Sequence, residues 1–238
     1  MDRTNSRIFH ITTTIRDLVI LNLLFLLCCL PVFTAGAAAA ALYTCLFRIQ
    51  EKKEGYISRD FFHAFKENFN KSMLIWLIFL AVGLVLYGDI RILSVLKEEL
   101  LPLRVAIGVF FFIYLCFVTY VFPLTAFFNN TVPGTLKNAF WMSMGYLPLT
   151  LSLLVIECLP VFLIYIRPQW EIAFLPFMLL LGVALQGYAC TFIFRFIFGR
   201  YVTREGAGQQ KNDAEAFSGG SMQPSVVEKD GERNDDAE

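Results

Sequence analysis

The sequence predicts an all-α fold, a polytopic helical membrane bundle followed by a polar C-terminal tail. Of its 238 residues, 57% are hydrophobic and only 17% are charged, whereas soluble domains carry about 25% charged residues. The charges also cluster, which leaves apolar stretches of the length that crosses a bilayer as a helix, about 20 residues. The sequence lacks the ten-residue alternation that is typical of a membrane β-barrel.

Five apolar segments follow one another along the chain, and we expect four or five of them to cross the membrane completely. The short connection 167–170 predicts that the last two segments form an antiparallel hairpin. We divide the chain into a helical membrane domain, residues 1–203, and a tail, residues 204–238. The segments cover residues 18–47, 73–88 or 73–96, 101–128, 139–166 and 172–198.

The first segment is expected to be broken at Pro31–Gly36. It contains the stretch LPVFTAGAAAAALY, in which Pro31, Thr34, Gly36 and Tyr43 interrupt a run of leucine and alanine. Proline ends or kinks a helix because it lacks the N–H group, and small residues allow close helix packing in membranes. Two interpretations fit, a hairpin that returns to the same side or one kinked helix that crosses. We do not expect signal-peptide cleavage, because apolar residues continue past the alanine run.

The distribution of Lys and Arg favours the hairpin. The loop 48–71 contains six of these residues, and cytoplasmic loops of membrane proteins are enriched in them. A hairpin places thirteen Lys and Arg in the cytoplasm and four outside, whereas a crossing first segment gives ten and seven. Both interpretations put the C-terminal tail in the cytoplasm.

An amphipathic helix is expected near residues 58–71, lying in the membrane surface. Ser58 suits an N-cap position, and an aromatic face with lysines elsewhere is typical of interfacial helices. The alternative is a soluble connector packed on the bundle. The residues that carry this expectation are Asp60, Phe61, Phe62, Phe65, Lys66 and Phe69.

The tail from Arg204 onward is expected to be disordered. It contains nine acidic and four basic residues and few apolar ones. A segment of this composition buries too little apolar area to offset the entropy lost on ordering.

Three polar residues within the apolar segments form a candidate intramembrane site: Glu157, Gln186 and Asn22. Ionisable groups inside membrane spans are functional candidates by default. Glu157 precedes the predicted turn by ten residues, which corresponds to a depth of about 15 Å. Counting from the same turn places Gln186 about six residues deeper, so direct contact between the two is not expected. The site either binds a substrate or proton, or Glu157 is a protonated carboxyl bonded to a neighbouring helix.

Several classes of function have no support in the sequence. The six cysteines lie in apolar stretches without a CxxC pair, and the two histidines lack a ligand-spaced partner, so we expect no metal site and no cofactor. Motifs such as GxSxG and HExxH are absent, so we expect no enzymatic activity. A net charge of zero argues against general nucleic-acid binding.

The break and the aromatic block together resemble the YesL-like family of bacterial multipass membrane proteins. The first block of the family is Pro-x-x-Thr-x-Gly followed by small residues and Ala-Leu-Tyr, which residues 31–43 match. The second block is Asp-Phe-Phe-x-x-Phe-Lys-x-Asn-Phe, which residues 60–69 match. The resemblance implies a bacterial plasma-membrane location and a link to carbohydrate uptake, since family members are often encoded beside sugar ABC-transporter components. It implies no catalytic residue.

Two functions follow from the sequence and the resemblance. The first is an accessory or regulatory partner of a carbohydrate ABC importer, which contacts the lipid bilayer and the importer's membrane subunits and performs no chemistry itself. The alternative is a small solute transporter or channel that uses Glu157 and Gln186.

Overall fold

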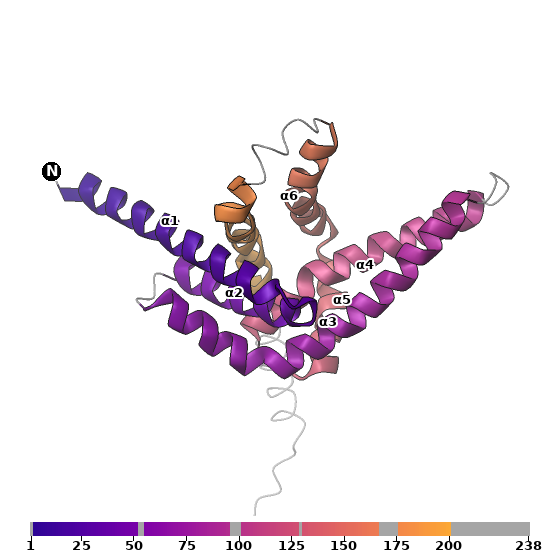
Figure 1. The fold of residues 1–238 in the computed structure, drawn as a ribbon, viewed down its shortest axis with the longest axis horizontal. Coiled ribbons are helices and arrows are strands. Elements are labelled where there is room, and N and C mark those ends of the chain that lie inside the picture. Colours follow the sequence, from indigo (N-terminus) through magenta and orange to yellow (C-terminus); the bar gives the residue numbers. More distant parts are fainter. Residues whose placement is uncertain (1, 52–54, 96–100, 129, 167–175, 201–238) are drawn as a thin grey trace, which may run out of the picture. The chain divides into compact units, whose positions relative to one another are not determined.

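A computed structural model describes residues 2–51, 55–95, 101–128, 130–166 and 176–200 (Figure 1). These residues are helical apart from short connections, and no strand occurs among them. Six of the described helices are long and apolar enough to cross a membrane. The predicted fold class is therefore confirmed, and the protein is a multi-pass helical membrane protein. The bundle described below belongs to one compact unit, Met1–Ile197; the predicted tail, residues 204–238, lies outside the described residues.

The first apolar segment consists of two helices, α1 (Asp2–Cys29) and α2 (Ala35–Gln50), which lie side by side (Figure 1). Leu18 and Leu21 of α1 share a buried cluster with Leu42 and Cys45 of α2. Since the chain reverses between them, this is the hairpin that the charge distribution favours.

Each arm of the hairpin is long enough to cross a membrane, so the described residues contain six candidate spans instead of the four or five that were predicted. The spans are Thr12–Cys29, of 18 residues, and Val32–Gln50, of 19, and each is about 27–29 Å long. Helix α1 begins before the predicted apolar segment, which started at Leu18, and runs through Arg16 and Asp17, whose side chains form an ion pair of 2.9 Å.

The turn of the hairpin occupies residues 30–34, slightly earlier than the predicted break at Pro31–Gly36. It includes a short 3-10 helix, η1 (Val32–Thr34). The buried Thr34 Oγ1 lies 2.6 Å from the carbonyl oxygen of Cys28 and 2.7 Å from that of Pro31. Trp76 Nε1 donates to the carbonyl of Val32 at 2.7 Å. Of these carbonyls, that of Cys28 belongs to the last turn of α1, where carbonyls lack partners within the helix; those of Pro31 and Val32 lie in the turn itself.

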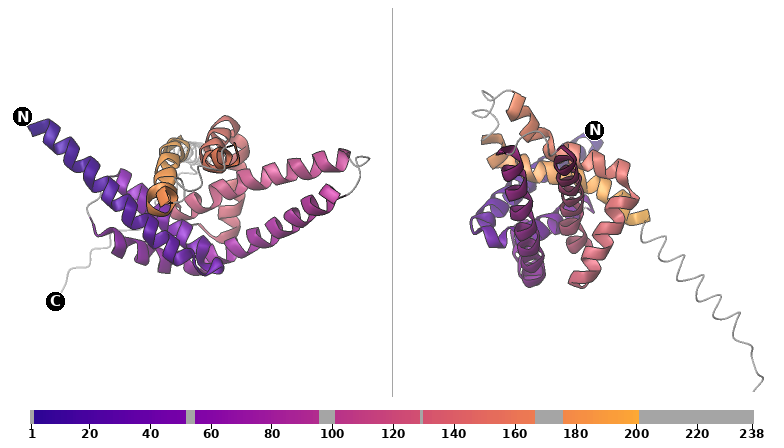
Figure 2. Two further views of the ribbon diagram at one scale, coloured as in Figure 1. Left: turned by 45° about the horizontal axis from the view of Figure 1, so that its top comes forward. Right: turned by 90° about the vertical axis from the view of Figure 1, so that its right-hand side faces the viewer.

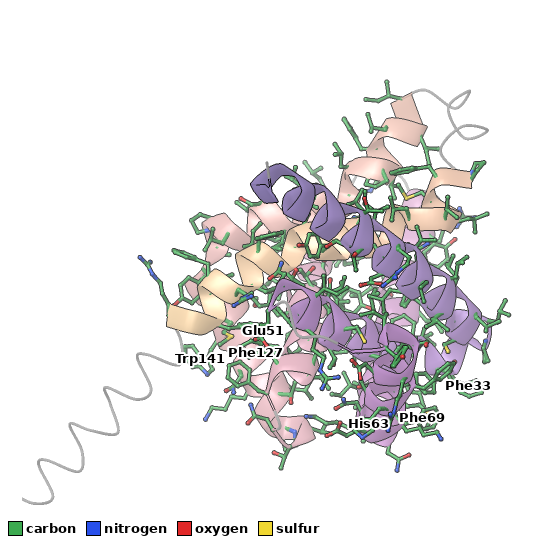
Figure 3. All side chains as sticks on the ribbon, turned by 90° about the vertical axis from the view of Figure 1, so that its left-hand side faces the viewer. Phe33, Glu51, His63, Phe69, Phe127 and Trp141 are labelled. Atoms are coloured by element: carbon green, nitrogen blue, oxygen red, sulfur yellow. The ribbon has the colours of Figure 1, made fainter. Side chains whose placement is uncertain are left out.

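Helix α3 (Ile57–Val95) is a single helix of 39 residues that packs along α2. The segment predicted as an interfacial helix, near 58–71, is therefore the N-terminal part of this longer helix. Phe61 is fully buried in the cluster that joins α1 and α2, whereas Phe62 is exposed. His63 and Phe69 lie along the same part of α3 (Figure 3). The location of this part at the membrane surface stays a prediction.

Helix α4 (Leu101–Phe127) runs beside α3 (Figure 2). The predicted segment 139–166 is two helices, α5 (Val132–Gly145) and α6 (Leu147–Ile166). A continuous helix is blocked here because Pro148 has no N–H to donate and its ring would clash with the carbonyl four residues earlier. With 14 residues, α5 is too short to cross a membrane.

The last span, Met178–Arg200, begins with a π-helix, η4 (Met178–Gly182). Helix α1 packs against η4. The π-helix widens the backbone spiral for one turn, so it leaves backbone groups without their usual α-helical partners.

Candidate functional site

A cavity of about 220 Å³ lies between the hairpin, α6 and the last span. It brings together Glu157 of α6, Gln186 of the last span and Tyr43 of α2, three residues singled out from the sequence. Its remaining lining is mostly apolar and consists of Phe25, Ala39, Leu42, Val183, Gly187 and Cys190. The lining therefore combines residues from the N-terminal helices α1 and α2 with residues from α6 and the last span.

Glu157 is held by a neighbouring helix. Its Oε2 atom lies 2.9 Å from Oγ1 of Thr119 on α4, and the same hydroxyl lies 3.0 Å from the carbonyl oxygen of Leu115. A hydroxyl has one proton to donate. Thr119 therefore either donates to a charged Glu157, or donates to Leu115 while a protonated Glu157 donates to Thr119. Sequence reasoning missed Thr119; its position in mid-span was the available signal.

Gln186 lies nearer to Glu157 than the sequence predicted. Its Nε2 donates to the carbonyl of Ile156, the residue before Glu157, at 2.9 Å. The six-residue offset was counted from the predicted turn at residues 167–170, and residues 167–175 lie outside the described part of the chain. No direct contact is needed, since each polar side chain has its own partner in the bundle.

Tyr43 is positioned by aromatic packing. Its ring meets that of Phe194 edge-on, with centroids 5.9 Å apart, and Phe194 meets Tyr120 in the same way at 5.4 Å. The hydroxyl of Tyr120 in turn bonds to Oγ1 of Thr150 at 3.0 Å. Edge-to-face contacts of this kind favour one ring orientation, so the Tyr43 ring is held in place where it lines the cavity.

Asn22 does not line the cavity and instead bonds to the π-helix. Its Nδ2 donates to the carbonyls of Met178 at 3.1 Å and Leu179 at 2.8 Å, and its Oδ1 accepts from the N–H of Ala184 at 2.9 Å. Asn22 is fully buried. It supplies the partners that the irregular backbone lacks, and it fixes the start of the helix that carries Gln186.

The motif residues Pro31, Thr34 and Gly36 build the hairpin and do not reach the cavity lining. A Cβ atom on Gly36 would lie 2.5 Å from Cβ of Trp76 and 2.6 Å from the carbonyl oxygen of Ser72. Only glycine permits this approach of α2 to the backbone of α3. Phe33, next to these residues, is exposed (Figure 3).

The residues of the aromatic block have different surroundings. Phe61, Phe65 and Phe69 form a row of ring contacts along α3, with centroids 6.3 Å and 5.4 Å apart. Asp60 forms an ion pair of 2.9 Å with Arg48 of α2. Lys66 is exposed. The block thus ties the start of α3 to α2.

The chemistry available in the cavity is a carboxyl, a carboxamide and a phenol in mainly apolar surroundings. Its volume, about 220 Å³, is below the range of about 300–1,000 Å³ that is usual for small-molecule pockets. It is large enough for a few waters or a small polar group. Among the described residues, no group of three or more His, Cys, Asp or Glu side chains is arranged to hold a metal ion.

Fold and cavity together define a multi-pass helical membrane protein with a small, mainly apolar cavity that contains three polar side chains. Residues 18–90 match the family described as "Protein of unknown function, DUF624", which YesL-like proteins carry. The match covers α1 from Leu18, the turn, α2 and most of α3. Over 150 residues the chain is 29% identical to "Uncharacterized protein YteU" of Bacillus subtilis (strain 168). The aligned region covers 63% of this chain and 68% of that protein. No solved structure matches.

Proposed function

We propose that this protein is an accessory or regulatory partner of a carbohydrate ABC importer in the bacterial plasma membrane, with a cytoplasmic C-terminal tail. In this role it performs no chemistry itself. The main supporting observation is that the three polar side chains singled out in the apolar segments each bond to a neighbouring helix. Glu157 is paired with Thr119, Gln186 with a backbone carbonyl, and Asn22 with three backbone groups. Each of these bonds joins two different helices of the bundle.

The exposed surfaces of α3 and α4 also suit a partner protein. Large apolar side chains protrude from both helices where they run together, including Val85 at 65% exposure and Phe110 at 65%. In a membrane these side chains contact lipid or the helices of another subunit. The link to carbohydrate import comes from the resemblance to YesL-like proteins.

Co-purification tests the accessory role. The tagged full-length protein is extracted in mild detergent from cells that express the membrane subunits of a candidate sugar importer. We expect those subunits to co-purify, and the variants Val85→Ala and Phe110→Ala to reduce their yield. Leu151→Ala and Val155→Ala on α6 are matched controls, since Leu151 and Val155 are also exposed apolar residues. Equal yields from all four variants would argue against docking through α3 and α4.

The cavity favours a second candidate function, a small solute transporter or channel that uses Glu157 and Gln186. Both residues line one cavity together with Tyr43, and ionisable groups in spans often mark transport sites. Uptake of labelled sugars or ions by the pure protein in liposomes tests this candidate. If the unsubstituted protein takes up solute and the Glu157→Gln variant does not, the result favours transport over the accessory role. Absence of uptake supports the accessory role.

A further inference from the structure

A second cavity, of about 330 Å³, lies where α2 ends and α3 begins. Its lining differs from that of the first cavity, because charged and hydrogen-bonding side chains dominate it. The lining residues are Arg48, Gly55, Tyr56, Arg59, Asp60 and His63. None of them belongs to the Glu157 cavity, and the importer role proposed above does not involve this second cavity.

An ion pair organises the cavity. Arg48 Nη1 lies 2.9 Å from Oδ1 of Asp60, and the Arg48 side chain is 45% exposed. A guanidinium has five N–H donors, so Arg48 retains donors for a further ligand. Gly55 allows the chain to pass close to this pair, since a Cβ atom there would lie 2.9 Å from Oδ2 of Asp60.

The charge balance of the cavity favours an anion. Asp60 offsets one of the two guanidinium groups, and the other, Arg59, is exposed and lines the same space. His63 adds a nitrogen donor, although its Nδ1 lies 3.7 Å from Glu67 Oε2, and Tyr56 adds a hydroxyl. The start of α3 contributes the positive end of a helix dipole. Guanidinium groups recognise phosphate through paired, charge-assisted hydrogen bonds.

The place of the cavity in the fold points to the headgroup layer. It lies between the end of the span Val32–Gln50 and the start of the span Ile57–Leu93, and the connection between two spans lies at the membrane surface. Basic pockets between membrane helices bind the phosphates of lipid headgroups. Tyr56, an exposed aromatic side chain, lines the cavity, and aromatic residues are enriched at this depth.

We propose that the cavity lined by Arg48, Arg59 and His63 binds a phosphate group, either that of an anionic membrane lipid or that of a soluble phosphate. Arg48, fixed by Asp60, provides a preorganised donor. Arg59 provides the net positive charge.

A binding experiment with the full-length protein in an uncharged detergent tests this proposal. Short-chain phosphatidylglycerol, short-chain phosphatidylcholine and inorganic phosphate are titrated separately, and thermal unfolding is followed by tryptophan fluorescence. A ligand that binds only the folded state raises the unfolding temperature as its concentration increases. We expect phosphatidylglycerol to raise it and phosphatidylcholine to have a much smaller effect.

The variants locate the effect in this cavity. We expect Arg59→Gln to weaken phosphatidylglycerol binding about tenfold without altering the unfolding temperature of the free protein, because Arg59 is exposed. Lys66→Gln removes the same charge from an exposed position on α3 outside the cavity lining and should leave binding unchanged. Arg48→Lys keeps the charge but loses the planar fork, and should also weaken binding.

The three titrations distinguish a lipid phosphate from a soluble phosphate and from the absence of a specific site. Stabilisation by phosphatidylglycerol alone, sensitive to Arg59→Gln, identifies a lipid phosphate. Equal stabilisation by inorganic phosphate, with the same sensitivity, identifies a soluble phosphate. Equal effects of phosphatidylglycerol and phosphatidylcholine, or identical binding by Arg59→Gln and the unsubstituted protein, would overturn the proposal.

Discussion

The backbone N–H of Ala184 donates a hydrogen bond of 2.9 Å to Oδ1 of Asn22, across 162 residues of sequence. The amide of the same asparagine donates to the carbonyls of Met178 and Leu179. One buried side chain of α1 thus satisfies three backbone groups around the π-helix. It also links the N-terminal hairpin to the span that carries Gln186, so the cavity depends on this contact.

Replacing Asn22 by leucine should destabilise the bundle by about 2–4 kcal/mol, because buried backbone groups would lose their partners. Asn68→Leu is the control, since Asn68 bonds to the carbonyl of Ala64 in its own helix, at 3.2 Å. The free energy of unfolding, measured in detergent with both variants, checks this. Hydrogen exchange at Ala184 should accelerate in Asn22→Leu alone; unchanged protection there would contradict the role given to Asn22.

Gly36→Ala should cost about 1–3 kcal/mol, because its methyl group would overlap the backbone of α3 at Ser72. Gly88→Ala should be neutral or stabilise slightly, since a Cβ atom at Gly88 meets nothing within 4 Å and alanine favours helix over glycine. Thermal unfolding of the two variants side by side provides the measurement. Equal unfolding temperatures would show that α2 and α3 are not in close contact at Gly36.

Thr119 and Glu157 should be energetically coupled. A double-mutant cycle with Thr119→Val and Glu157→Leu should give a coupling energy of about 0.5–3 kcal/mol, as expected for residues that share a hydrogen bond. Ser152→Ala serves as the reference for Thr119→Val, because Ser152 bonds only within α6, to Pro148 at 3.1 Å. Strict additivity of the Thr119 and Glu157 substitutions would mean that the two residues do not interact in the folded protein.

Deletion of residues 205–238 should leave membrane insertion intact. The segment is polar and carries a large share of the acidic residues of the chain, a composition that is expected to supply little apolar surface for packing. Membrane fractionation and gel filtration in detergent measure the outcome. Loss of the truncated protein from the membrane fraction would require a structural role for the tail.

The parts of the fold that the sequence predicted well depend on local chemistry. Pro31 and the alanine run indicated a break and a close helix contact, and the Lys and Arg distribution favoured the hairpin; the structure confirms both. The predicted apolar segment began at Leu18, after Arg16 and Asp17, whereas helix α1 continues through these two charged residues.

The parts that it did not predict depend on contacts between distant residues. The π-helix at Met178–Gly182 is stabilised by Asn22, and no local pattern encodes that partnership. The hydrogen bond of Gln186 to the carbonyl of Ile156, beside Glu157, depends on the packing of two helices, which hydropathy alone does not define. The division of α5 from α6 was signalled by Pro148, but other prolines, such as Pro123 in α4, leave their helices continuous.

The hairpin of α1 and α2 is central to the account, because both cavities are built on α2. Its direct test is cysteine labelling of intact cells with an impermeant thiol reagent, in a background that lacks the six native cysteines. The variants are Asn5→Cys, Tyr56→Cys and, as the external control, Leu101→Cys. We predict labelling at position 101 and protection at positions 5 and 56 until the cells are permeabilised. Labelling of position 5 with protection of position 56 would show that the first apolar segment crosses the membrane only once and would contradict the hairpin.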